Sequence, residues 1–354
     1  MAETAEIAEM ANKVSEELFE WFKWEKIPVM DQNFDCHKKD KHFPGTDENH
    51  LKTHPVDVVF KYRDPYSGVF VYLNTDLKSY KKNSITTTQI RGALRSLACT
   101  IDCAAGSPEW KEKYCLDQNP FEVRGMLFVY NHDGEFDKAF YDLFNPKANS
   151  KGKLSGGIDL SKIPIEKNQK IHIFEPTMIN YMQTIISDMN ELHHRGTFPK
   201  EDYFFYYPDQ NLHKCLGGNE KLNPATVEAI TAPFLFVKHD EIDSYNETTK
   251  KVERTFGRGL VIYFNRNGSN EYEFVYLFDI LSKFQLLNKE LKIRIRVASQ
   301  NPDKNIQSKY KKAINIYSRD WNFDDNKKSL LDNIEFKVIN RTKSIFSTHE
   351  LAWR

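Results

Sequence analysis

The sequence predicts an α/β fold in which a mixed β-sheet flanked by helices is followed by a second α/β unit. Two runs rich in Val, Phe and Tyr, residues 56–62 and 69–73, flank a turn sequence and are typical of a β-hairpin. Residues 123–130 form a continuous apolar run, as a central strand buried on both faces requires. Helical periodicities alternate with these strands, and a similar alternation resumes further along the chain. We therefore expect domains of residues 1–208 and 209–354.

The first domain is expected to follow the order α-β-β-α-β-α-β. An amphipathic helix at 4–24 comes first, and the hairpin follows it. A second helix should begin at Thr86, because Thr86 and Gln89 fit a capping box. The remaining expected elements are a strand at 123–130, a short helix at 136–144, a strand at 170–174 and a helix from Pro176 to about Leu192.

The second domain is expected to alternate strands and helices in the same way. Its predicted strands are 234–238, 259–264, 292–297 and 334–339, and its predicted helices are 272–287 and 306–318. It contains no nucleotide-binding fingerprint. Dimerisation, DNA binding and regulation therefore all stay open as its role.

The composition excludes some function classes. The 50 basic and 50 acidic residues give a formal net charge of zero, so the whole chain does not attract nucleic acid and any phosphate binding must come from local patches. No run approaches the roughly 18 apolar residues of a membrane helix. The first ten residues carry acidic side chains where a signal peptide needs basic ones. We expect a cytoplasmic protein without a membrane partner.

The hairpin sequence makes a geometric prediction about two acidic residues. A symmetric loop at 65–68 places Asp57 directly opposite Asp76, with Cβ atoms roughly 4.5–5.5 Å apart. Lys78 shares the face of Asp76, because strand side chains alternate. Two carboxylates this close repel each other, and a divalent cation such as Mg²⁺ relieves that repulsion. The alternative is an ordinary solvated hairpin that carries acidic residues.

The helix that begins near Thr86 carries polar residues beside its apolar stripe. Gln89, Arg91 and Arg95 lie on its flanks, from which they could face the hairpin. The chain thus runs from a strand ending in Asp76-x-Lys78, through a short polar loop, to a helix that presents Gln and Arg.

This order resembles the PD-(D/E)xK nuclease superfamily, whose core is the restriction-endonuclease-like fold. Pro55-Val56-Asp57 stands for the Pro-Asp of the motif with one residue inserted, and Asp76-Leu77-Lys78 supplies the (D/E)xK. The resemblance covers roughly residues 5–180 and assigns no subfamily.

The resemblance implies a DNA endonuclease that depends on Mg²⁺ or Mn²⁺. Asp57 and Asp76 would hold the metal, with the Leu77 carbonyl as a third ligand, and Lys78 would act on the attacking water or the phosphate. Gln89 would position water or phosphate, and Arg91 or Arg95 would hold the DNA backbone. A first-helix acid sometimes adds a ligand in this superfamily, and Glu17 is the candidate here.

The resemblance also implies roles and partners. Restriction, antiphage defence and repair are the expected roles, in a homodimer or as a member of a multi-protein defence complex. The alternative function is a catalytically inactive scaffold that binds nucleic acid or a protein. An RNA-directed nuclease is less favoured, because the sequence contains no recognised RNA module.

A further basic row is predicted in the second domain. Lys292, Arg294 and Arg296 alternate with apolar residues in a predicted strand. The apolar set should face the core and the basic set should form an outer row that could follow a phosphate backbone. A solvated face, or an edge strand protected by charge, is the alternative.

The segment 31–54 is predicted to be a long loop or a DNA-facing insertion, because it is polar and carries clustered lysines. The five cysteines of the chain form no CxxC pair and are expected to be reduced. Cys99 and Cys103 have helical spacing and are expected to pack in the core. A zinc site in the segment is less favoured, because its Cys and His residues match no standard zinc spacing. These residues are Cys36, His37, His42, His50 and His54.

Overall fold

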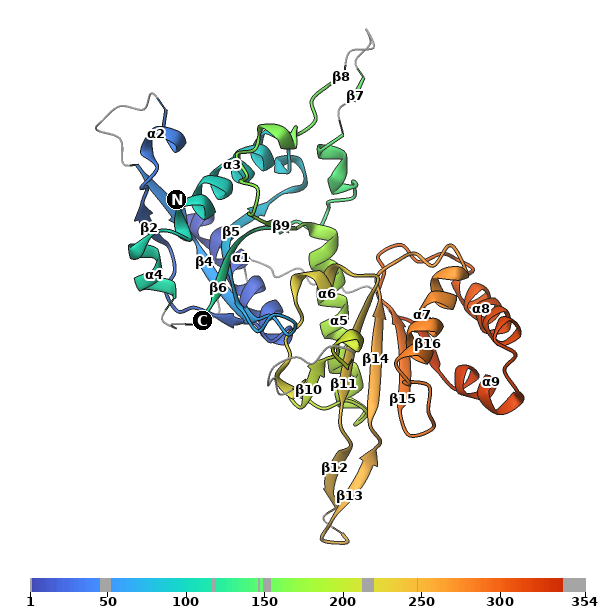
Figure 1. The fold of residues 1–354 in the computed structure, drawn as a ribbon. Helices are drawn as coiled ribbons and strands as arrows, with labels where there is room; N and C mark the ends of the chain where they lie inside the picture. Colours follow the sequence, from blue (N-terminus) through green and yellow to red (C-terminus); the bar gives the residue numbers. More distant parts are fainter. Residues whose placement is uncertain are drawn as a thin grey trace. The chain divides into compact units, whose positions relative to one another are not determined.

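The computed structural model describes residues 2–44, 52–115, 119–145, 147–148, 154–211, 220–246 and 248–339. They form two compact units (Figure 1). The first holds the described residues up to 64 and from 69 to 179, and the second holds 65–68 and those from 180 onward. The division between these units lies within helix α5 (Pro176–His194). Strand β10 (Tyr203–Phe205), which precedes the expected boundary at 208, pairs with the sheet of the second unit.

The first unit is built on a five-stranded mixed sheet of order β1-β4-β5-β6-β9. Its strands are β1 (Glu25–Lys26), β4 (Val58–Arg63), β5 (Phe70–Tyr80), β6 (Phe121–Asn131) and β9 (Ile171–Phe174). The pairs β1–β4 and β4–β5 are antiparallel, whereas β5–β6 and β6–β9 are parallel. The predicted mixed sheet is confirmed, with the apolar β6 inside it.

Helix α1 (Ala2–Trp21) covers one face of this sheet. The ring of Phe19 meets the rings of Phe60 at 4.8 Å, Phe128 at 5.8 Å and Phe174 at 5.6 Å, which belong to three different strands. These edge-to-face aromatic contacts anchor the helix on that face.

Helix α3 (Thr87–Ala104) covers the opposite face. The Thr86 side chain accepts the backbone N–H of Gln89, which confirms the predicted start of the helix. Its buried stripe packs with Leu127 and Val129 of β6. The helix approaches the sheet closely at Gly125, where a Cβ atom would lie only 3.0 Å from Leu97. Leu97 and Ile171 would have to shift to make room for a side chain at that position.

The predicted long loop at 31–54 contains regular structure. Strand β2 (Gln32–Asp35) pairs with β3 (Thr53–Val56), and the short helix α2 (Lys39–His42) lies between them in sequence. Helix α4 (Pro108–Tyr114), which the sequence analysis did not predict, begins at the capping residue Ser107. The predicted helix at 136–144 is only a 3-10 turn, η2 (Phe140–Leu143). The other short elements are η1 (Lys82–Ser84), β7 (Lys147–Ala148), β8 (Leu154–Ser155) and η3 (Leu160–Lys162).

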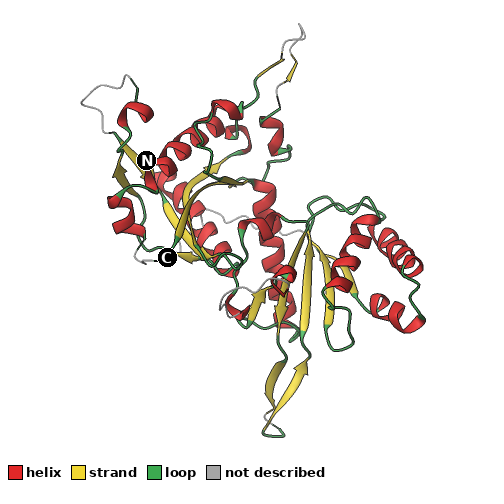
Figure 2. Cartoon of the chain, in the orientation of Figure 1, coloured by secondary structure: helices red, strands yellow, loops and turns green. Residues whose placement is uncertain are grey.

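The second unit is built on the sheet β10-β11-β14-β15-β16. Strands β11 (Phe234–His239) and β14 (Gly259–Phe264) are antiparallel neighbours, and β15 (Lys292–Val297) and β16 (Glu335–Val338) follow in parallel. Its other elements are η4 (Pro208–Asn211), η5 (Glu220–Leu222), α6 (Val227–Thr231), β12 (Ile242–Asn246), β13 (Lys251–Phe256), α7 (Tyr272–Lys283), α8 (Ile306–Asp320) and α9 (Asp325–Asp332). Figure 2 shows the alternation of strands and helices that the sequence predicted.

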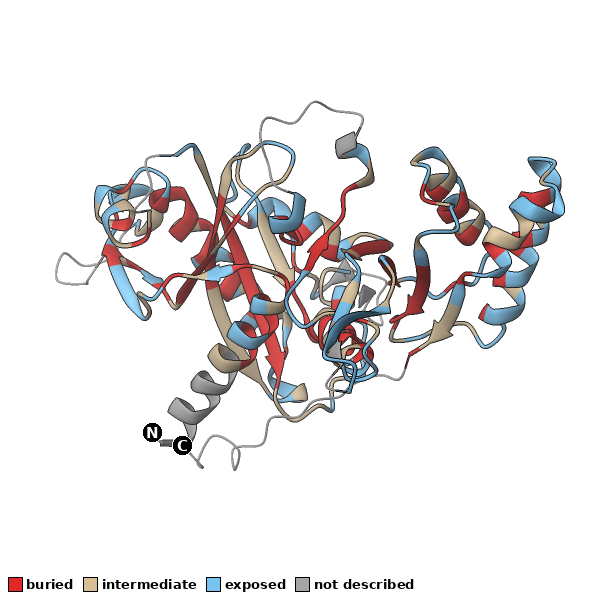
Figure 3. Cartoon of the chain, turned by 90° about the horizontal axis from the view of Figure 1, so that it is seen from below, coloured by how far each residue is buried: buried red, intermediate tan, exposed pale blue. Residues whose placement is uncertain are grey.

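Both faces of the interior strand β15 are covered. Ile293, Ile295 and Val297 pack against α7 and α8 on one face. On the other face Asp188 of α5 accepts a hydrogen bond from Tyr263 of β14 at 3.1 Å. Nearly every residue of β14 and β15 is therefore buried, and Figure 3 shows buried residues in red. Within the described residues no helix has the length and apolar character needed to cross a membrane.

Candidate active site

Asp57 lies at the junction of β3 and β4, opposite Asp76 of β5. The pairs run from Val58 with Thr75 to Arg63 with Phe70, and this is the register that the sequence predicted. One further step brings Asp57 level with Asp76. Asp76 is in turn the parallel partner of Leu127, so its side chain lies on the face that α3 covers.

Two hydrogen bonds hold Asp57, one to its side chain and one to its backbone. The Leu77 N–H donates to Asp57 Oδ2 at 2.7 Å, and the Asp31 N–H donates to the Asp57 carbonyl at 3.0 Å. The first bond ties the carboxylate of one strand to the backbone of the next. The second bond ties Asp57 to the β2–β3 hairpin.

The two carboxylates and Lys78 form one electrostatic unit. Burial, and then the charge of Asp76, raise the pKa of Asp57 to about 6, while the Leu77 N–H and Lys78 act in the opposite direction. The Lys78 ammonium forms an ion pair with Asp76. Burial disfavours its charge, but the two carboxylates outweigh burial and raise the pKa of Lys78, which stays protonated. The site thus holds two adjacent acids and one cation that neutralises only part of their charge.

Asp57 should make the stability of the metal-free protein fall as pH rises. Its folded pKa of about 6 lies above the ordinary 3.8, so the folded state keeps the proton more tightly than the unfolded state between these values. The favourable contribution is complete below about pH 4 and is lost as pH rises through about 6. By pH 8 the ionised group costs on the order of 1–3 kcal/mol.

Asp57→Asn should remove this pH dependence, because the amide keeps an oxygen for the Leu77 N–H. Urea unfolding in EDTA should find the variant more stable than wild type at pH 8 and equal to it near pH 4. A difference between the two proteins that stays constant with pH would show that the Asp57 proton is not held in this way.

The structure places the three predicted α3 residues in the first half of that helix. Gln89 and Arg95 are exposed. Arg91 is half-buried, and its guanidinium donates to the Gly157 carbonyl at 3.4 Å. All three belong to the helix that covers the face of Asp76 and Lys78. Gln89 and Arg95 are the two that solvent reaches most easily.

Glu17 is not brought to the two aspartates. It lies on α1, the helix that packs on the opposite face of the sheet. Its carboxylate is exposed and lies 3.9 Å from Lys13. In the part of the chain that the structure describes, no third Cys, His, Asp or Glu side chain joins Asp57 and Asp76 in a group of metal-binding size. The backbone of Leu77 does lie next to the Asp57 carboxylate.

The family model described as "GAPS4 protein PD-(D/E)XK nuclease domain" matches residues 1–178, which is half of the chain. The chain belongs to this nuclease family. The match ends one residue before the first compact unit gives way to the second within α5, so the family's domain and the first unit coincide at that end. No curated protein and no solved structure matches the chain.

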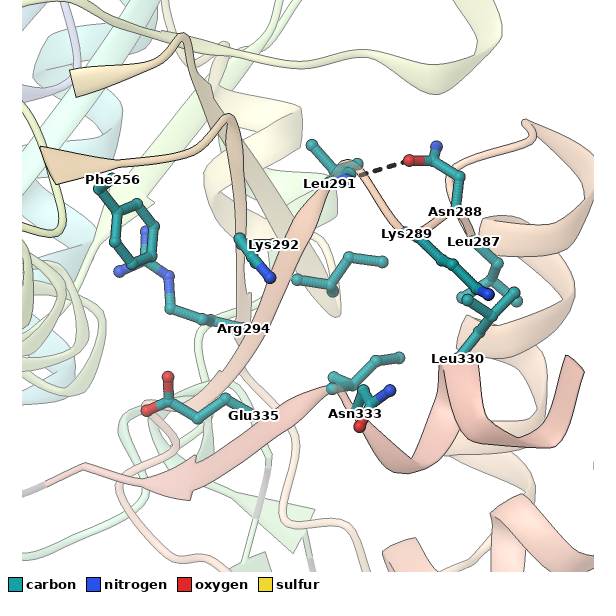
Figure 4. Close-up of a pocket in the computed structure, with 12 residues that line it drawn as sticks. Phe256, Leu287, Asn288, Lys289, Leu291, Lys292, Arg294, Leu330, Asn333 and Glu335 are labelled. Carbon is teal, nitrogen blue, oxygen red and sulfur yellow. Dashed lines mark hydrogen bonds between the residues drawn. The ribbon is translucent and has the colours of Figure 1, made fainter. Parts of the chain in front are cut away.

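The basic row of the second unit lies outside this nuclease domain, and its predicted exposure is wrong for two of its three residues. Lys292 is exposed, but Arg294 and Arg296 are only 3% and 1% exposed. Arg294 donates to His239 Nε2 at 2.9 Å. Its guanidinium lies over the ring of Phe256, 5.0 Å from the ring centre (Figure 4). Arg296 pairs with Glu335 at 2.9 Å and with Asp188 at 3.7 Å. The polar face of β15 is buried under α5, so the two arginines cannot follow a phosphate backbone.

Arg296 should therefore stabilise the fold. Arg296→Gln leaves the buried Asp188 without its cation and should lower the free energy of unfolding by about 3–5 kcal/mol. Lys292→Gln on the same strand is the control and should change it by less than about 0.5 kcal/mol. Urea unfolding of both variants checks this. If both substitutions change the free energy of unfolding by the same small amount, Arg296 does not stabilise the fold.

The structure also gathers a group that the sequence analysis did not assemble. Cys36, His42, His54 and Cys103 bring their ligand atoms within 4.8 Å of one another. Cys103, which was expected to pack in the core, meets the segment from another helix. His37 is not part of the group, and His50 lies outside the described residues. The His and Cys content of the segment indicated a possible metal site, but spacing along the chain could not identify Cys103 as its fourth residue.

Proposed function

We propose that this protein is a Mg²⁺-dependent nuclease that hydrolyses phosphodiester bonds in DNA. The observation that supports this most is the position of Asp57, which directly precedes the β4–β5 ladder and lies opposite Asp76, beside the charged Lys78. The family match supports a nuclease domain. Mg²⁺ dependence, a DNA substrate and turnover are the parts of the proposal that need experiment.

The residues fit a divalent cation, with Mn²⁺ as the alternative ion. The raised pKa of Asp57 reflects burial beside the Asp76 carboxylate, and a cation between two such groups removes their repulsion. Asp57 and Asp76 would be its ligands, and the Leu77 carbonyl is the backbone candidate. Once bound, such an ion polarises the scissile phosphate and lowers the pKa of a bound water.

The protein's own side chains would do the positioning. Lys78 lies two residues beyond Asp76 on the same face, roughly 6.6–6.8 Å along the strand, and its ammonium would orient the attacking water or stabilise charge on the phosphoryl oxygens. Gln89 would hold water or phosphate. Arg95 is exposed and would contact the DNA backbone, whereas Arg91 would first have to leave the Gly157 carbonyl.

Restriction, antiphage defence or repair is the proposed biological role, in a homodimer or a multi-protein defence complex. The second unit would then supply dimerisation, target choice or regulation. With Arg294 and Arg296 buried, these two residues give no support to DNA binding by that unit.

The experiment incubates purified protein with plasmid DNA, linear duplex DNA and RNA of matched length, with EDTA, Mg²⁺ or Mn²⁺. We expect cleavage of DNA with Mg²⁺ or Mn²⁺ and none with EDTA. Asp76→Asn serves as the inactive control.

If only RNA is cleaved, the protein is a nuclease but its proposed substrate, DNA, is wrong. Binding of DNA without cleavage under every metal would favour an inactive scaffold.

A further inference from the structure

Four metal-binding side chains from four separate segments meet inside the nuclease domain. Cys36 directly follows β2, His42 ends α2, His54 belongs to β3, and Cys103 lies in the last turn of α3. Cys36, His54 and Cys103 are at most 2% exposed, and the side chain of His42 is also 2% exposed. None of the four takes part in the proposed nuclease centre.

Four of the six distances among the ligand atoms are close to the edges of a tetrahedron around a zinc ion, and all six are within 4.8 Å. Zn–S bonds of about 2.3 Å and Zn–N bonds of about 2.0–2.1 Å give tetrahedral edges of about 3.8 Å between two sulfurs, about 3.6 Å between sulfur and nitrogen, and about 3.4 Å between two nitrogens. Cys36 Sγ and Cys103 Sγ are 3.6 Å apart, and each is 3.4 Å from His42 Nδ1. His42 Nδ1 and His54 Nε2 are 3.2 Å apart.

Hydrogen bonding alone does not explain this arrangement. His42 Nδ1 has three polar neighbours at 3.2–3.4 Å, namely both thiols and the ring of His54. An imidazole nitrogen carries either one proton or one lone pair, so it can make only one good hydrogen bond in the ring plane. A metal cation bound between the four atoms would explain why four potential ligand atoms lie so close together.

The surroundings of His42 are those of a metal ligand. Its other nitrogen, Nε2, lies 3.0 Å from Asp102 Oδ2, so Nε2–H donates to the carboxylate and Nδ1 keeps its lone pair toward the two sulfurs. Asp102 is itself held by Lys38 at 2.8 Å, Lys41 at 2.9 Å and Gln169 at 3.0 Å. A carboxylate that orients a ligating histidine in this way is a common feature of zinc sites. Two of the clustered lysines of this segment, Lys38 and Lys41, thus bind Asp102.

We propose that Cys36, His42, His54 and Cys103 bind one Zn²⁺ ion as a structural site. Two thiolates and two imidazoles in tetrahedral geometry favour zinc over the hard cations that bind carboxylates. All four positions are filled by protein, which is typical of a structural site and leaves no position for a substrate. The site is separate from the proposed Mg²⁺ centre and does not depend on it.

The zinc ion would connect the β2–β3 hairpin and α2 to α3. His54 lies three residues before Asp57 on the same stretch of chain, and the Asp31 N–H that holds the Asp57 carbonyl comes from the other arm of the hairpin. Zinc would therefore fix the segment that places Asp57. Because such ions add their binding free energy to folding, its removal should loosen this segment.

The first test measures the metal content of the wild-type chain by plasma mass spectrometry. The protein is purified without a histidine tag and without chelator. We expect about one zinc ion per chain, retained through dialysis against Mg²⁺ buffer. After exchange of zinc for Co²⁺, the absorption spectrum should show sulfur-to-cobalt charge transfer and the ligand-field bands of a tetrahedral site.

The second test compares two cysteines of α3. Cys103→Ser should reduce the zinc content to less than about a tenth of an ion per chain. Cys99→Ser, one helical turn earlier and outside the group, is the matched control and should keep the full content. A strong chelator should lower the melting temperature of wild type and of Cys99→Ser, but not that of Cys103→Ser. If Cys103→Ser does not fold, the wild-type metal content and Co²⁺ spectrum decide alone.

Three results would overturn the proposal. The first is wild-type protein that takes up no zinc after reconstitution while its thiols remain free. The second is a Cys36–Cys103 disulfide in the purified chain. The third is a full equivalent of another metal in place of zinc. A failure of the zinc site would leave the nuclease proposal untouched, because Asp57, Asp76 and Lys78 are not its ligands.

Discussion

Lys78→Ala should lower the single-turnover rate of DNA cleavage about 10²–10³-fold, which is the usual effect of losing one preorganised donor. The ammonium has no lone pair with which to bind a metal, so its contribution belongs to the transition state. In the metal-free protein it is bound to Asp76, which places it beside the proposed metal ligands. DNA affinity in Ca²⁺, measured by fluorescence anisotropy, should change little.

Two further variants make this prediction specific. Lys61→Ala removes a partly buried, ion-paired lysine of the neighbouring strand and should cleave at the wild-type rate. Lys78→Arg should rescue poorly, because a planar guanidinium does not replace a compact ammonium. If Lys78→Ala cleaves DNA at the wild-type rate, the Asp76-x-Lys78 sequence has no catalytic role and is an ordinary part of a hairpin.

Asp57→Asn and Asp76→Asn should each lower Mg²⁺-dependent cleavage by at least about 10³-fold. A bound metal supplies several kcal/mol of transition-state stabilisation, and each 1.36 kcal/mol is a factor of ten in rate. Calorimetric titration with Ca²⁺ should show loss of the binding site in both variants. Both proteins should remain folded, since each amide relieves the repulsion that raises the pKa of Asp57.

Asp137→Asn is the control for this pair, since Asp137 is an exposed acid of the same unit that is paired with Lys82. It should bind Ca²⁺ and cleave as wild type does. Full cleavage by Asp76→Asn together with a loss of stability would assign Asp76 a structural role and remove the metal site.

The register of the hairpin could be predicted from sequence because local geometry determines it. A symmetric four-residue loop and two strands with alternating side chains leave one pairing, and the structure has that pairing. The start of α3 was predictable for the same reason, since the Thr86 cap lies three residues before its partner. The mixed sheet followed from the order of such local signals.

Features that depend on distant segments were not predictable in this way. The alternation in β15 shows that its two faces differ, but not that α5 buries the polar face and brings Asp188 to Arg296. In the same way, nothing near Cys36 or His54 indicates that Cys103 will meet them from α3. Glu17 shows the same limit. Its helix precedes the motif in sequence, but the sequence does not indicate that this helix packs on the sheet face opposite Asp76.

The central claim is that Asp57, Asp76 and Lys78 form a metal-dependent nuclease centre. The most direct test is the single-turnover rate of linear DNA cleavage as a function of Mg²⁺ concentration at pH 8, for wild type and Asp76→Asn. We predict a rate that rises to saturation in wild type and stays at background in Asp76→Asn. Wild-type cleavage that persists in EDTA, or an identical Mg²⁺ curve for the two proteins, would contradict the claim.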